Sequence, residues 1–183
     1  MSCEQLTWTA YESPLGRLTL IASPAGIREV RFPGRSGRLA KAALRRMPQA
    51  EGQLTSYFAG ERRDFELELD LRGAALQRLV WEQLMRIPYG ATTTYGELAQ
   101  RVDASVYPDG LATYKRARLI GAAVGRTPTP ILLPCHRVIG ADGSLTGYGG
   151  GLPRKQALLD LEGGRTAAKT HPPNLANRQL ALL

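Results

Sequence analysis

The spacing of the hydrophobic residues changes near residue 72, and this change constrains the fold more than any other feature of the chain. Over 65–71 apolar residues alternate strictly with acidic ones, which is typical of a half-buried strand. Over 76–87 they recur at helical spacing, which is typical of a helix with one apolar face. The sequence therefore predicts an α+β chain with a small domain at 1–72, a second domain at 73–164 and a flexible tail at 165–183.

Turn residues divide the first domain into short segments. Pro and Gly within 13–16 and 23–26 set turn dihedrals, so 6–32 is predicted to be an antiparallel meander of strands. The apolar residues over 39–47 fall at helical spacing and predict a helix there. The small domain is thus expected to combine a sheet with a helix.

The second domain contains a predicted helix-turn-helix. Thr94 and Glu97 match the capping-box pattern, in which a hydroxyl and a carboxylate close the first turn of a helix. A connector at 103–112 contains Pro and Gly, and the apolar residues over 114–124 then lie on one helical face. Two helices with a turn between them are the natural interpretation.

Basic residues dominate the same region. The chain has 24 Lys and Arg against 16 Asp and Glu, and no acidic residue occurs between Gly110 and Ala141. The basic residues there are Lys115, Arg116, Arg118, Arg126 and Arg137. A basic helix-turn-helix predicts a surface for nucleic acid, although a solvated basic face would look the same. Small residues at 121–123 would let the second helix approach DNA closely, and they would serve helix packing equally well.

Composition excludes several classes of protein. Hydrophobic residues make up 43% and charged residues 22% of the 183 positions, which argues against disorder, collagen-like repeats and a coiled coil. No apolar run approaches the roughly 20 residues that cross a bilayer, and 1–10 lacks a signal-peptide pattern, so a cytoplasmic location without membrane contact is expected. Cys3 and Cys135, with His136 and His171, lack metal-ligand spacing, and neither a metal nor a disulfide is expected.

Cys135 is the candidate nucleophile. It lies beside His136 and two residues before Arg137, and positive or basic neighbours favour the reactive thiolate. Because adjacent side chains diverge in an extended segment, His136 would reach the sulfur through a water molecule. Glu162 could orient the imidazole, as the third member of a triad does. The alternative is that Cys135 is simply a small buried hydrophobic residue.

Other segments frame this cysteine. Residues 129–133 predict a short apolar strand or extended segment that leads into it. The glycine-rich segment 147–151 could line a pocket for a flat ligand and offer backbone donors, and a phosphate cradle is the weaker interpretation. Pro153 suits the first turn of a last helix, which should end before Gly163.

The heptapeptide at 134–140, Pro-Cys-His-Arg-Val-Ile-Gly, resembles the active-site signature of the O6-alkylguanine-DNA alkyltransferases, also called methylated-DNA–protein-cysteine methyltransferases. Further matching pieces follow the same order: Trp81, 87–90, 95–99, Arg118, Gly121, 147–151, Lys155, 158–159 and Glu162. The resemblance covers about 73–163. It implies a mostly helical domain with a winged-helix-like helix-turn-helix, preceded by a small ribonuclease-H-like domain at 1–72.

The resemblance also implies a function in direct-reversal DNA repair. The partner would be double-stranded DNA carrying O6-alkylguanine, bound through the minor groove with the damaged base flipped out. Cys135 would take the alkyl group, from O4-alkylthymine as well, in one irreversible event that needs no cofactor. The protein would act as a monomer, with cooperative binding on DNA left open.

Roles for individual residues follow from the same resemblance. His136, through water and backed by Glu162, would deprotonate Cys135, and Tyr95 would donate a proton or hydrogen bond to the leaving guanine. The substrate-binding residues would be Val138, Tyr148, Gly149, Lys155 and Val124, with the carbonyls of Cys135 and Val138 reading the guanine amino group. The DNA-binding residues would be Arg118, Tyr95, Lys115, Arg116, Ala117, Gly121 and Ala122. Arg118 would fill the gap left by the flipped base.

Three departures from the family pattern keep alternatives open. Thr127 precedes Pro128 where the family usually has Asn at a hinge, the connector 103–112 is long, and Gly149 replaces a Ser found in some members. One alternative is a DNA-damage-binding module whose thiol is impaired. The other is a hydrolase that uses Cys135, His136 and Glu162 as a triad with multiple turnovers.

Overall fold

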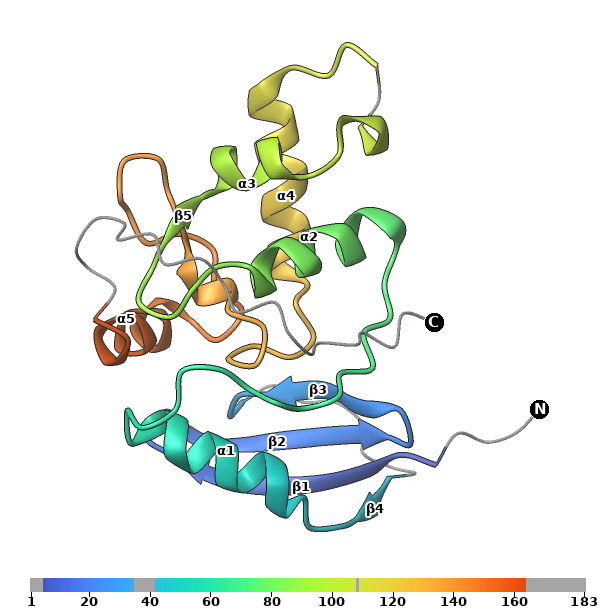
Figure 1. The fold of residues 1–183 in the computed structure, drawn as a ribbon, viewed down its shortest axis with the longest axis vertical. Coiled ribbons are helices and arrows are strands. Elements are labelled where there is room, and N and C mark those ends of the chain that lie inside the picture. Colours follow the sequence, from blue (N-terminus) through green and yellow to red (C-terminus); the bar gives the residue numbers. More distant parts are fainter. Residues whose placement is uncertain (1–4, 35–41, 108, 164–183) are drawn as a thin grey trace. The chain divides into compact units, whose positions relative to one another are not determined.

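The computed structural model describes residues 5–34, 42–107 and 109–163. The chain divides into two compact units, the first ending at Arg72 and the second beginning at Gly73. The first is built on a sheet and the second mostly on helices (Figure 1), which confirms the predicted α+β fold. The predicted tail at 165–183 lies outside the described residues. None of the helices in the described ranges has the length and apolar character needed to cross a membrane.

The first unit opens with the predicted antiparallel meander. Strands β1 (Thr7–Ser13), β2 (Gly16–Ser23) and β3 (Gly26–Arg31) pair in sequence order, and the sheet order is β3-β2-β1-β4. Gly26 has a φ of 139°, and a Cβ there would lie 2.4 Å from the carbonyl oxygen of Glu68. Glycine is therefore required at this turn.

The helix predicted over 39–47 is wrong for residues 42–47, and 39–41 lie outside the described residues. Ala43–Leu44 forms strand β4, which runs parallel to β1, and the N–H of Arg45 donates to the carbonyl of Trp8 at 2.9 Å. Helix α1 begins later and spans Pro48–Phe58. The helical spacing of the apolar residues was misleading because β4 forms by pairing with the edge strand β1, which lies 36 positions earlier in the chain. Such a long-range pairing leaves no trace in the local spacing of apolar residues.

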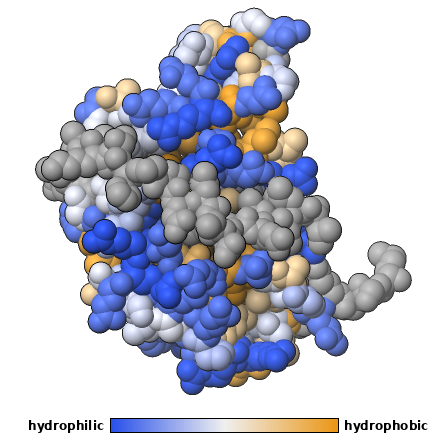
Figure 2. Space-filling view, in the orientation of Figure 1, coloured by the Kyte–Doolittle hydropathy of each residue, from blue (hydrophilic) through white to orange (hydrophobic). Residues whose placement is uncertain are grey.

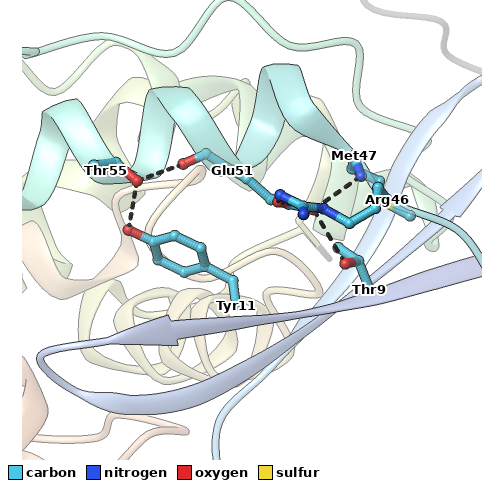
Figure 3. A network of polar contacts seen from close by, with 6 residues as sticks. All are labelled: Thr9, Tyr11, Arg46, Met47, Glu51 and Thr55. Carbon is cyan, nitrogen blue, oxygen red and sulfur yellow. Dashed lines mark hydrogen bonds and ion pairs between the residues drawn. The ribbon is translucent and has the colours of Figure 1, made fainter.

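A carboxylate joins α1 to the sheet (Figure 3). Glu51 accepts hydrogen bonds from the backbone N–H of Met47 at 3.0 Å and from the hydroxyl of Thr9 at 3.1 Å, and it pairs with Arg46. It thereby satisfies a backbone donor at the beginning of the helix. The hydrogen bond from Arg46, followed by that from Met47, holds the pKa of the Glu51 carboxyl below its usual range.

Replacing Glu51 with Ala is expected to lower the free energy of unfolding by about 1 kcal/mol, because a helix cap and a link to β1 are lost together. Because the folded-state pKa of Glu51 is depressed, this contribution is present above the ordinary carboxyl pKa and is lost as the pH falls below it. Urea titrations at neutral and acidic pH test this. Glu51→Gln, which keeps an acceptor, should lose less, and an equal loss in both variants would contradict the cap.

The strand predicted over 65–71 is reduced to one parallel bridge between Ile27 and Leu69. The predicted alternation of burial is present at Phe65, Leu69 and Leu71, which are buried. Asp70, expected to face solvent, is buried instead and pairs with Arg28 at 2.5 Å. This inward-facing ion pair breaks the regular pattern of polar residues outside and apolar residues inside, so the segment does not continue as a strand.

The second unit contains each predicted helix. The elements are α2 (Ala75–Met85), β5 (Thr93–Thr94), α3 (Tyr95–Arg101), η1 (Ala104–Val106), α4 (Thr113–Gly125), η2 (Cys135–Arg137), β6 (Val138–Ile139) and α5 (Leu152–Leu161). The capping box of α3 forms as predicted, with Glu97 N–H donating to Thr94 at 3.1 Å and Thr94 N–H donating to Glu97 at 2.8 Å. The indole of Trp81 donates to the Ala123 carbonyl at 3.2 Å and links α2 to α4.

The segment predicted as an extended strand at 129–133 is a turn. Ile131 has a φ of 77°, and Pro130 and Leu133 form an isolated bridge around it. A positive φ is strained for a β-branched residue, and the burial of Ile131 in the core holds it there. The turn delivers the chain directly to η2, where the candidate nucleophile lies.

Candidate active site

Cys135 begins the short helix η2, and its neighbours come from two separate elements. Directly after η2, strand β6 pairs in parallel with β5, so that Val138 lies beside Thr93. Strand β5 leads into Tyr95 at the first position of α3. The cysteine and the start of α3 are thereby brought together. Cys135 is only 4% exposed.

His136 is held by a carboxylate at the end of α5. Its Nε2 lies 2.9 Å from Oε1 of Glu162, and both side chains are fully buried. Arg137 approaches the same carboxylate from its other side, with Nε 2.8 Å from Oε2 and Nη2 2.9 Å from Oε1. A bidentate guanidinium of this kind fixes the plane of the carboxylate, and through it the imidazole.

The segment 87–90 completes the surroundings of Glu162. The carbonyl of Ile87 accepts a hydrogen bond from Arg137, and the N–H of Gly90 donates to Oε2 of Glu162 at 3.3 Å. Gly90 has a φ of 75°, and a Cβ there would lie 2.8 Å from the Glu162 carbonyl oxygen. The Ile-Pro-Tyr-Gly sequence therefore serves the site by permitting this close approach.

The charges around Glu162 determine the protonation of His136. Burial would raise the pKa of the Glu162 carboxyl, but His136 and Arg137 outweigh it and hold that pKa well below its usual range. Burial lowers the pKa of His136, against the raising effect of Glu162, so the imidazole is neutral at pH 7. With Nε2–H donated to Glu162, Nδ1 carries the lone pair. Nδ1 is buried without a hydrogen-bond partner, so its lone pair is free to accept a proton.

The thiol itself is protonated in this environment. Burial raises the pKa of Cys135 to about 11, although the hydroxyl of Thr127 and the charge of Lys155 act in the opposite direction. Lys155 is fully buried, and burial lowers its pKa to about 8. Its ammonium donates to the carbonyls of Val138 at 2.5 Å and Thr146 at 2.7 Å. Lys155 thus ties the loop 140–151 to the strand that follows the cysteine.

Tyr95 links the same loop to helix α4. Its hydroxyl donates to the carbonyl of Thr146 at 3.2 Å and lies 3.4 Å from that of Gly147. A Cβ on Gly121 would lie 3.8 Å from the Tyr95 ring. Burial raises the pKa of the Tyr95 phenol, and a thiolate at Cys135 would act in the same direction, so Tyr95 keeps its proton.

Two family models match this chain. One describes the DNA-binding domain of 6-O-methylguanine DNA methyltransferase and matches residues 75–164; the other describes its ribonuclease-like domain and matches residues 6–71. The chain belongs to this family. The family's two-domain fold, with a sheet domain followed by a helical domain, is the one described above.

Individual relatives agree with the family assignment. A methylated-DNA–protein-cysteine methyltransferase of Mycolicibacterium paratuberculosis is 43% identical over 86% of this chain and 92% of its own length. One from Mycobacterium tuberculosis H37Rv is 43% identical over 88% of this chain and 94% of its own. The crystal structure of M. tuberculosis OGT in complex with DNA has a TM-score of 0.76 at 43% identity, covering 88% of this chain and 96% of that one.

The residues that the sequence selected are partly brought together. His136 and Glu162 are in direct contact, and Tyr95 and Lys155 both donate to Thr146. Tyr148 and Gly149 lie on the loop 140–151 that Lys155 and Tyr95 hold. Val124 is buried in α4, and its carbonyl accepts a hydrogen bond from the Thr127 hydroxyl at 2.8 Å. Within the described ranges, no group of three or more His, Cys, Asp or Glu side chains could hold a metal ion.

The predicted DNA-binding residues of α4 fall into two groups. Lys115, Arg118 and Ala122 are exposed, whereas Ala117 and Gly121 are half-buried. Arg116 is half-buried as well. Its Nε donates to the Leu111 carbonyl at 3.0 Å, and its guanidinium lies 5.0 Å from the centre of the Tyr107 ring. In this structure Arg116 anchors the long connector to α4.

Sequence reasoning missed the main role of Arg137. We expected its charge to act on Cys135, but the guanidinium is committed to Glu162 and to the carbonyl of Ile87. The partner carboxylate lies 25 positions away, so the pairing follows from the fold. The nearest sequence signal is the placement of an arginine directly after His136.

Proposed function

We propose that this chain repairs duplex DNA by transferring the alkyl group of O6-alkylguanine to Cys135, once per protein molecule. The observation that carries the proposal is the buried Cys135 beside a neutral His136, whose unpartnered Nδ1 is available and whose Nε2 is held by Glu162. Family membership and the transferase names of the relatives support the same activity.

The reaction follows from these protonation states. The Cys135 proton passes through a bridging water to Nδ1 of His136, because the thiol has a pKa of about 11 and needs a base. The sulfur then bonds to the alkyl carbon as the bond between that carbon and O6 breaks. Tyr95, which keeps its proton, donates a hydrogen bond to the leaving guanine anion, and the proton that His136 took from the thiol balances the proton that this anion takes up. The product is a thioether that no neighbouring group can hydrolyse, so the protein is consumed.

The base-binding pocket is assigned to the segment after the nucleophile and to the loop 140–151. The carbonyls of Cys135 and Val138 accept from the guanine amino group; Val138 already accepts from Lys155, and a carbonyl oxygen has two lone pairs. Tyr148, Gly149 and Val124 complete the walls, as the family resemblance implies. The exposed Gly149 adds no side chain, which leaves room for larger adducts and for O4-alkylthymine.

Helix α4 is assigned to the minor groove of DNA, with the alkylated base flipped towards Cys135. The supporting observations are the exposed Lys115 and Arg118 on α4 and the complex of M. tuberculosis OGT with DNA. We propose that the chain acts as a monomer. A cytoplasmic location stays a prediction.

The mass of the intact protein tests the proposal. After incubation with duplex DNA containing O6-methylguanine, one methyl group is expected on the peptide that holds Cys135, with a stoichiometric end point. Binding without a gain of mass would favour a damage-binding module with an impaired thiol. Neither binding nor a gain of mass would refute the proposal, and multiple turnovers of an ester or amide would favour the hydrolase.

Replacing Arg118 with Ala is expected to slow transfer from duplex DNA by about tenfold or more while leaving transfer from a free O6-alkylguanine base unchanged. Only a paired base must be flipped, and the exposed guanidinium is assigned to the gap that flipping leaves. Single-turnover rates on the two substrates give the comparison. Arg126→Ala is the matched control, because it removes an exposed charge directly after the C-terminal end of α4. Equal losses on duplex and free base would count against the flipping role.

A further inference from the structure

The exposed residues of α4 form one stripe along the helix, and we call this set the α4 stripe. Its members are Thr113, Tyr114, Lys115, Arg118, Leu119, Ala122 and Gly125. With about 100° of rotation per residue, Tyr114 and Leu119 lie about 140° apart, at the two margins of the part of the stripe that follows Thr113. Arg118 and Ala122 fall between them. The stripe therefore has apolar side chains at its margins and a small residue with a cation at its centre.

The apolar margins are unusual for this protein. Among the described residues only four large hydrophobic side chains are exposed: Leu44, Tyr114, Leu119 and Leu152. Two of these four are the margins of the α4 stripe, at 71% and 38% exposure. Figure 2 shows hydrophobic surface among hydrophilic residues in the upper part of the view. Apolar groups that flank cations on one exposed face indicate an anionic partner with apolar walls.

The minor groove of duplex DNA has these properties. Phosphates edge the groove, and the carbon-bound hydrogens of the deoxyriboses form its walls. The groove is about 6 Å wide, whereas a helix with side chains measures about 10 Å across. A helix therefore enters only where the side chains in the middle of its exposed face are small and the groove widens. Ala122 and the half-buried Gly121 supply the small centre. Tyr114 and Leu119 are then placed to meet one wall each.

The connector before α4 fixes the position of Tyr114. Tyr107 is buried and donates from its hydroxyl to the Ala99 carbonyl at 3.1 Å. Arg116 stacks over the Tyr107 ring and donates to Leu111. These contacts tie the first turn of α4, through Arg116, to Leu111 and Tyr107. Tyr114 is therefore exposed on a positioned element, which reduces the entropy lost on binding.

We propose that Tyr114 and Leu119 make apolar contacts with the deoxyriboses on opposite walls of the minor groove and hold the groove open around Arg118. The inference rests on the proposed function and adds to it two residues that position the duplex. Because flipping requires a widened groove, the two side chains support transfer from paired DNA and have no part in the chemistry at Cys135.

Affinity for duplex DNA at several salt concentrations tests this inference. Tyr114→Ala and Leu119→Ala are each expected to weaken binding by about tenfold without changing the slope of log K against log salt, because no phosphate contact is lost. Lys115→Ala should lower that slope by about one. Tyr114→Phe should bind as the parent chain does. Leu44→Ala is the matched control, because Leu44 lies outside the stripe and is as exposed as Tyr114, at 71%.

The outcomes separate this inference from the proposed function. A parent chain that neither binds DNA nor gains an alkyl group refutes the proposed function. A parent chain that does both, with Tyr114→Ala and Leu119→Ala binding equally well, overturns the inference alone. A changed salt slope in either variant, or an equal loss in Tyr114→Phe, would also overturn it, because the contact would then be ionic or made by the hydroxyl. Transfer from a free alkylguanine base should be unchanged in both alanine variants.

Discussion

Replacing Cys135 with Ser is expected to slow alkyl transfer by a factor on the order of 10³ or more. A serine hydroxyl is a far weaker nucleophile than a thiol, and the neutral His136 that serves the thiol is too weak a base to activate it for attack on an alkyl carbon. Cys135→Ala should show no transfer at all. Both substitutions are close in size to cysteine, and the exposed face of α4 is unchanged, so DNA affinity should stay near that of the parent chain.

The measurement is the mass of the protein after incubation with O6-methylguanine DNA, with DNA affinity and melting temperature recorded for each variant. Cys3→Ser provides a matched control, because Cys3 is the only other cysteine in the sequence. It should transfer as the parent chain does. Undiminished transfer by Cys135→Ser, or a methyl group on the Cys3 peptide, would refute the assignment of the nucleophile.

The parts of the fold that the sequence predicted are those with local causes. The capping box of Thr94 and Glu97 specifies the start of α3 through contacts within one turn. The apolar face of α4 is likewise set by neighbours three and four residues apart. The failures have non-local causes. Strand β4 depends on the edge of β1, and the turn at Ile131 depends on burial that offsets an unfavourable φ.

The candidate site divides in the same way. Cys135 and His136 are adjacent, so a short sequence motif specifies them together. The hydrogen bond between His136 and Glu162, at the end of α5, is added by the fold. The commitment of Arg137 to Glu162 was not predicted, because basic neighbours of a cysteine are usually interpreted through their effect on the thiol. Arg116 was assigned to DNA from its charge and from the family resemblance, whereas its contact with the Tyr107 ring depends on tertiary structure that neither reports.

Replacing Glu162 with Gln is expected to lower the free energy of unfolding by about 3–5 kcal/mol, because the buried guanidinium of Arg137 would lose its counter-charge. Transfer should also slow by about tenfold or more, since the imidazole of His136 would lose the carboxylate that orients it. Urea titration and single-turnover transfer measure the two effects. Either effect alone would contradict a shared role of Glu162 in packing and catalysis.

Acid titration provides a second readout for the same residue. The folded-state pKa values of Glu162 and His136 are both lowered, so the unfolded chain takes up these protons at higher pH than the folded chain does. Stability of the parent chain should therefore decline as the pH falls below the ordinary histidine value of 6.5, and further below the ordinary glutamate value of 4.5. In Glu162→Gln the second part of this decline should be smaller but not absent, because Glu51 and Asp70 also have lowered pKa values.

The double variant Glu162→Gln with Arg137→Met separates packing from catalysis. Removing both charges relieves the unpaired guanidinium, so the double variant should be more stable than Glu162→Gln alone. Transfer should stay slow, because His136 still lacks the carboxylate that holds its Nε2. Recovery of stability together with transfer would mean that Glu162 acts only by neutralising Arg137. Recovery of stability alone would assign to Glu162 the positioning of the base.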